Sequence, residues 1–129
     1  MKKKKDKKET MQDEIVDSLL KHRVNSLEEK IEELDSGINE RFDLNVHAMG
    51  TLGTKVLRIK EKLKRLQYRN ITTGEISNIS HLEIELAKIE IQKNTEMLDC
   101  FRDIFKMREQ FQKSRQELVK ERLKLKLLE

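Results

Sequence analysis

The side chains that could bind a metal ion or act as a nucleophile are few in this chain and stand far apart. The three histidines are His22, His47 and His81, and Cys100 is the only cysteine. A zinc site gathers three or four such ligands, and a cysteine nucleophile needs a neighbouring base and a pocket. We therefore expect no catalytic residue, no metal site, no cofactor and no enzymatic activity. A single cysteine also cannot form an internal disulfide, which fits a reducing compartment.

Anion binding is the other chemistry that these residue types offer, and the densest positive charge lies at the N-terminus. Residues 1–9 hold two acids and six lysines, namely Lys2, Lys3, Lys4, Lys5, Lys7 and Lys8. The rest of the chain carries 22 basic and 22 acidic residues, so the formal net charge of +4 comes from this segment alone. We expect residues 1–10 to form a flexible basic tail. It fits a nuclear-import signal, a tether to nucleic acid or to an anionic membrane, a contact for an acidic protein, or a solvated tail.

A second basic stretch, residues 55–69, holds seven bases and one acid. It lacks the glycine-rich loop and the Gly-Lys-Ser/Thr ending of a phosphate-binding loop. If the chain folds back on itself, Glu83, Glu85 and Glu90 face this stretch and can neutralise it. We therefore expect a solvated helix face here.

Long helices must position these groups. Of the 129 residues, 40 % are charged, 36 % are hydrophobic and none is proline. An elongated helical protein needs little apolar material because each helix buries only a stripe, and a long helix excludes proline. The apolar runs are too short for a transmembrane segment, and no secretory signal is visible. We expect an all-α protein in an intracellular, cytoplasmic location, or in the nucleus if the lysine tail is an import signal.

Two apolar stripes with heptad spacing mirror each other about residue 72. When paired residues have numbers that sum to 145, large apolar side chains meet along both arms. The pairs are Leu66 with Ile79, Leu63 with Leu82, Ile59 with Leu86, Val56 with Ile89, Ile38 with Met107, Leu34 with Phe111, Leu27 with Leu118 and Leu20 with Leu125. This register predicts a coiled-coil helical hairpin of two long antiparallel helices, residues 11–69 and 76–127, joined by a loop at 70–75.

The heptad spacing slips by four residues once in each arm, at 38–49 and at 89–97. The first slip runs through Phe42 and Val46. In the mirrored register the slips give three layers with a polar member, namely Leu52 with Lys93, Met49 with Glu96 and Phe42 with Asp103. We expect local repacking to bring Met97, Phe101 or Ile104 inward instead.

Two glycines, Gly50 and Gly53, follow the first slip. In a helix interior each glycine destabilises by about 1 kcal/mol relative to alanine. These glycines either permit the close approach of another helix or mark a bend.

A third apolar stripe lies on the second helix, outside the core face that Leu82 and Leu86 define. Its members recur every seven residues, with the last one two heptads further on: Ile84, Ile91, Leu98, Phe105 and Val119. A two-helix hairpin cannot bury this face. We expect a protein interface here, with a second copy in a four-helix bundle or with a partner helix. The alternative is a wide core face with some exposed aliphatic side chains.

The expected function is that of a non-enzymatic coiled-coil interaction subunit: a scaffold, a spacer or an assembly adaptor. The architecture resembles stalk proteins of flagellar and type III secretion systems and small coiled-coil subunits of eukaryotic cytoskeletal, kinetochore and organelle-positioning complexes. That resemblance covers the whole chain and carries no specific motif. One alternative is a nucleic-acid-binding accessory protein that uses the lysine tail and residues 55–69, and its binding would weaken steeply with salt. Another is a secretion chaperone, a stalk protein or a phage-type inhibitor that binds a partner helix.

Overall fold

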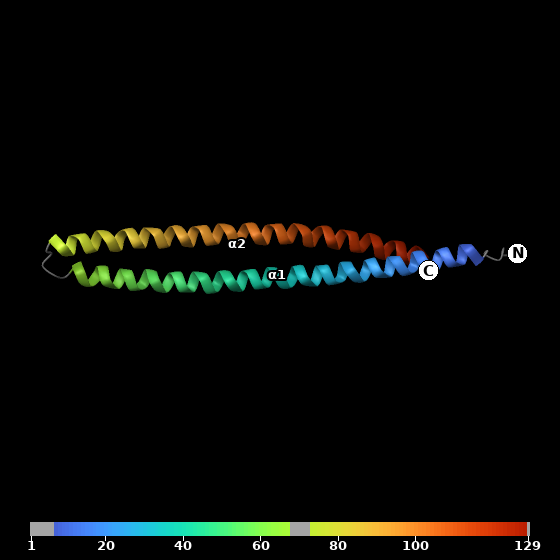
Figure 1. Cartoon of the computed structure of the whole chain (residues 1–129), viewed down its shortest axis with the longest axis horizontal. Coiled ribbons are helices and arrows are strands. Elements are labelled where there is room, and N and C mark those ends of the chain that lie inside the picture. Colours follow the sequence, from blue (N-terminus) through green and yellow to red (C-terminus); the bar gives the residue numbers. More distant parts are fainter. Residues whose placement is uncertain (1–6, 68–72, 129) are drawn as a thin grey trace. The chain divides into compact units, whose positions relative to one another are not determined.

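The computed structural model describes the backbone of residues 7–67 and 73–128 and the side chains of residues 11–66 and 76–128. Two helices make up this part of the chain: α1 spans Lys7–Gln67 and α2 spans Thr73–Leu128. They run in opposite directions and pack against each other (Figure 1). The all-α helical hairpin that the mirrored stripes predict is confirmed.

Both helices begin before the residues at which the apolar spacing becomes regular. α1 starts at Lys7 rather than at residue 11, and α2 starts at Thr73 rather than at residue 76. α1 ends at Gln67 and α2 ends at Leu128, within two residues of the expected ends. Residues 1–6 of the expected tail, residues 68–69 of the expected first helix and residues 70–72 of the expected loop lie outside the described residues.

The chain divides into two compact units, and both helices contribute to each. The terminal unit is Met1–Ile38 with Phe105–Glu129, and the turn unit is Asn39–Ile104. Each unit contains one segment of α1 and an antiparallel segment of α2 (Figure 1). Because each helix turns only a stripe toward its neighbour, the core of each unit is a single row of side chains.

The core of the terminal unit follows the predicted register. Its buried side chains are Leu20, Val24 and Ile38 on α1 and Ser114 and Leu118 on α2. Their counterparts at a sum of 145 are half-buried, among them Met107 opposite Ile38 and Leu27 opposite Leu118. A Cβ atom added at Gly37 would lie 3.3 Å from the Met107 sulfur, so the glycine lets the two helices approach closely at this layer.

The turn unit keeps the same register through the slip. Val56 and Ile59 are buried, and their counterparts on α2 are half-buried. Further from the turn, each member of three partly polar pairs is buried or half-buried: Met49 with Glu96, Asn45 with Cys100 and Arg41 with Ile104. Both helices step by four residues here, through Arg41, Asn45 and Met49 on α1 and through Glu96, Cys100 and Ile104 on α2. Both helices therefore shift by the same step in the same layers, and the pairing register between α1 and α2 stays unchanged.

The sequence prediction was wrong about which aromatic side chains occupy these layers. Phe42 is 39 % exposed, and Phe101 is 61 % exposed. Ile104 does turn inward, as expected, with 4 % of its surface exposed, and Met97 is half-buried. Phe42 stays outside because its neighbour Arg41 takes the inward position and forms ion pairs with α2.

Candidate functional site

The apolar stripe predicted on α2 is exposed along its whole length. In the turn unit Ile84, Ile91 and Leu98 are 55 %, 64 % and 64 % exposed. In the terminal unit Phe105 and Val119 are each 65 % exposed. Large apolar side chains that recur every seven residues on an outward helix face are typical of a surface that another helix covers.

A second row completes this surface within the turn unit. Ala87, Asn94 and Phe101 follow Ile84, Ile91 and Leu98 by three residues each, and all three are exposed. Residues spaced alternately three and four apart lie on one face of a helix, and such a face packs against another helix. We call the six residues the outer seam: Ile84, Ala87, Ile91, Asn94, Leu98 and Phe101. Sequence reasoning missed Phe101, although its spacing from Leu98 and Phe105 could have identified it.

A polar cluster extends from the core of the turn unit to its surface at the slip. The Arg41 side chain is only 16 % exposed, and its Nη1 donates to Glu96 Oε1 at 2.7 Å. Arg41 Nε donates to Asp103 Oδ2 at 2.9 Å, and Asn45 Nδ2 donates to Glu96 Oε1 at 3.3 Å. Two residues of α1 thus bind two carboxylates of α2. We call Arg41, Asn45, Glu96 and Asp103 the polar centre.

Hydrogen bonding perturbs the ionisation of two groups in the polar centre. The bond from Arg41, and next the bond from Asn45, lower the pKa of Glu96 below its ordinary value because both stabilise the carboxylate. The bonds to Glu96 and to Asp103 raise the pKa of Arg41 above its ordinary value. The polar centre is therefore a charged pair at neutral pH. This pair joins α1 to α2 at the slip.

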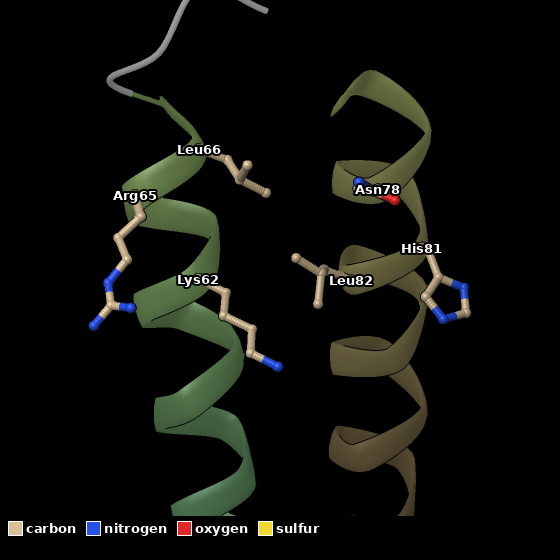
Figure 2. A pocket seen from close by; sticks show the side chains of 6 residues that line it. All are labelled: Lys62, Arg65, Leu66, Asn78, His81 and Leu82. Carbon is tan, nitrogen blue, oxygen red and sulfur yellow. The ribbon is translucent and has the colours of Figure 1, made fainter. Parts of the chain in front are cut away.

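A shallow groove runs between α1 and α2 on one side of the turn unit. Its floor is Ile59, Leu66, Leu82 and Ile89, and its rims are Lys55, Arg58, Lys62 and Arg65 from α1 and Asn78, His81, Glu85, Lys88 and Gln92 from α2. In Figure 2, Leu66 and Leu82 point toward one another, and Lys62 extends toward α2 below Leu66. We call this surface the basic groove, because its rims carry five cationic side chains and one carboxylate.

The acids expected to neutralise this stretch do not line the groove, except for Glu85. Each rim residue directly precedes a core residue, as Lys62 precedes Leu63. In an antiparallel pair, residues that precede core positions gather on one side, and residues that follow them gather on the other. Glu83 and Glu90 follow core residues, so they lie on the far side of the helix pair. None of the five rim cations forms an ion pair or hydrogen bond with another described residue.

The histidines and the cysteine do not form a site. His22, His47 and His81 are exposed. In the described part of the chain, no three His, Cys, Asp or Glu side chains gather as metal ligands would. Cys100 is a free thiol with 2 % of its surface exposed, packed in the core beside the polar centre. It therefore behaves as a small core residue of the turn unit.

The predicted lysine-tail contacts cannot be placed from this structure. Lys2, Lys3, Lys4 and Lys5 lie outside the described residues. Lys7 and Lys8 belong to the first turn of α1, but their side chains lie outside the described ones. Neither of the two helices, over the residues described, contains a stretch that is apolar and long enough to cross a membrane.

Comparison of the sequence and the structure with protein-family models, with curated proteins and with solved structures found no match. The assignment of a function therefore depends on the surfaces of the turn unit: the outer seam and the basic groove.

Proposed function

We propose that this protein is a non-enzymatic interaction subunit, and that its outer seam packs against the outer seam of a second copy. The observation that carries the proposal is the exposure of Ile84, Ile91 and Leu98, between 55 % and 64 %, at strict heptad spacing. Side chains of this size stabilise by about 1.5–3 kcal/mol each when they are fully removed from water. Burial of the apolar stripe that the hairpin leaves exposed therefore strongly favours association.

The outer seam is complementary to itself in antiparallel pairing. About a twofold axis between residues 92 and 93, paired residues have numbers that sum to 185. Leu98 then meets the small Ala87, Ile84 meets Phe101, and Ile91 meets Asn94. In this register every residue of the outer seam faces another residue of the outer seam, and the small Ala87 leaves room for Leu98. An isologous contact of this kind closes as a dimer, in which the two hairpins supply four helices.

Asn94 supports one register for this pairing. It is the only strongly polar residue of the outer seam, and it lies in the layers nearest the twofold axis. There the amide of one copy is close to the amide of the other, so each can donate to and accept from its counterpart. A single buried asparagine in an apolar seam specifies register and oligomer state at some cost in stability.

Sedimentation equilibrium tests the proposal with two matched double variants. Ile91→Glu with Leu98→Glu places two carboxylates in the outer seam. Leu44→Glu with Leu57→Glu makes the same change on α1, at side chains that are also 64 % exposed. We expect the native chain and the α1 variant to be dimeric and the seam variant to be monomeric. Circular dichroism checks that all three remain helical.

Two results would overturn the proposal. One is a native chain that stays monomeric over the whole concentration range. The other is equal weakening of association by both double variants, because the association would then not depend on the outer seam.

A further inference from the structure

The basic groove carries five cationic side chains against one carboxylate, and none of the five forms an ion pair with another described residue. Lys55, Arg58, Lys62 and Arg65 form one continuous row on α1, and Lys88 stands across the groove on α2. All five side chains are exposed. Like charges held this close repel one another, and a bound anion relieves that repulsion.

The spacing of the row fits a ligand with closely spaced negative charges. The four cations of α1 follow one another at steps of three, four and three residues, which corresponds to about 15 Å along the helix. A nucleic-acid duplex carries one negative charge per roughly 1.7 Å of its axis. Along one strand the axial spacing is about 3.4 Å per charge, which is finer than the steps of about 5 Å between the cations, so several cations of the row can each lie near a phosphate.

The groove offers too little apolar surface for a third helix or for a membrane. Its floor residues are buried or half-buried by their own hairpin, and none belongs to the exposed large hydrophobic residues of the described chain. A docked amphipathic helix needs apolar contact along the groove, and a membrane-surface helix needs apolar side chains that insert. The exposed side chains of the groove are mainly cationic, so its ligand must bind mainly through negative charge.

The groove also lacks the features that read bases. No phenylalanine, tyrosine or tryptophan is among its lining residues, and His81 is the only aromatic ring on its rims, so unpaired bases have no row of rings on which to stack. Lysine and arginine side chains that contact phosphates position a protein on a duplex without reading its sequence. We propose that the basic groove binds the phosphate backbone of a nucleic-acid duplex without sequence specificity. This site lies on a different face of α2 from the outer seam and does not depend on it.

Substitution of Glu85 provides a second test of the same site. It is the only carboxylate on the rims and stands one helical turn from Lys88. In a phosphate-binding groove Glu85 opposes the ligand, so Glu85→Gln should strengthen duplex binding about two- to five-fold. Unchanged duplex binding by Glu85→Gln would contradict the proposal, because it would mean that the phosphates do not lie beside Glu85.

Fluorescence anisotropy with a labelled DNA duplex, measured over a range of salt concentrations, tests the proposal. The groove variant is Arg58→Gln with Lys62→Gln. The matched control is Lys60→Gln with Lys64→Gln, which removes two charges at the same four-residue spacing on the other side of α1. All proteins are full-length, so the lysine tail contributes equally to each. The native chain should bind with an affinity that falls steeply with salt.

The expected difference between the variants is large. Loss of two phosphate contacts should weaken binding by about tenfold or more and reduce the salt slope by about 2, whereas the control should stay within about twofold of the native chain. Equal effects of the two variants, or no binding by the native chain, would overturn the proposal. So would equally tight, groove-dependent binding to polyglutamate, or a preference for vesicles of anionic lipid over the duplex.

Discussion

Arg41 Nη1 lies 2.7 Å from Glu96 Oε1, and this ion pair joins α1 to α2 where the apolar packing of the turn unit is interrupted. The two side chains are 16 % and 25 % exposed, so the pair is partly shielded from water. A shielded pair is more valuable for specificity than for stability, because a slipped register leaves a charge in the core without its partner. Asn45, which also donates to Glu96, penalises a slipped register in the same way.

The lowered pKa of Glu96 predicts that acid weakens the turn unit. A carboxyl group whose pKa is lower in the folded state than in the unfolded state contributes stability above its ordinary value of 4.5. That contribution is lost as the pH falls through the lowered pKa. Denaturant unfolding of the native chain and of Glu96→Gln should therefore show a stability difference at neutral pH that closes in acid. A difference that is independent of pH would contradict the assignment.

Truncation of two adjacent residues of the terminal unit should have effects of very different size. Leu118 is 7 % exposed and Val119 is 65 % exposed. Leu118→Ala should lower the free energy of unfolding by about 2–4 kcal/mol, because it leaves a cavity in a narrow core. Val119→Ala should change it by less than about 0.5 kcal/mol. Thermal unfolding of the two variants checks this, and equal losses would mean that α2 is rotated from its described orientation.

The glycines of the turn unit offer a stabilising change. A Cβ atom added at Gly50 or at Gly53 would meet nothing within 4 Å. Alanine at either position should therefore raise the free energy of unfolding by about 1 kcal/mol, since it favours the helix without a clash. Gly37→Ala serves as the comparison and should gain less, because its Cβ would press on the Met107 sulfur at 3.3 Å. Destabilisation by alanine at Gly50 or Gly53 would show that another molecule or a bend requires the glycine.

The burial of Cys100 predicts slow chemical labelling. With 2 % of its surface exposed, its thiol should react with a disulfide reagent only when the turn unit opens. The labelling rate should rise with denaturant in parallel with the loss of helix. Labelling at the rate of a free thiol in native buffer would show that the core around the polar centre is open.

The hairpin could be predicted from the sequence because apolar spacing and register are properties of the chain itself. Pairs such as Leu20 with Leu125 and Leu66 with Ile79 need only helical periodicity to be recognised. The occupants of the slip could not be predicted in this way. Apolar spacing favours Phe42 over Arg41 as the core residue. In the structure Arg41 lies inside and Phe42 outside, because two carboxylates of α2 bind the Arg41 guanidinium.

The surfaces were predictable to different degrees. The exposure of Ile84, Ile91 and Leu98 follows from their spacing alone. The basic groove does not, because the facing α2 segment contains Glu83, Glu85 and Glu90, and the sequence alone does not say which of these acids lie beside the cations. The structure shows that Glu83 and Glu90 lie on the opposite side of the turn unit from the cations. The rim cations precede core residues on the chain, whereas Glu83 and Glu90 follow core residues.

The distance between spin labels on two copies tests the antiparallel outer seam most directly. Double electron–electron resonance would use Thr95→Cys and His81→Cys, each in a Cys100→Ser background. Since paired residues have numbers that sum to 185, the two labels at position 95 should be offset by about 8 Å along the helices and those at position 81 by about 35 Å. A short distance at 95 with a long distance at 81 is the predicted result. Short distances at both positions, or no signal between copies at either, would contradict the pairing.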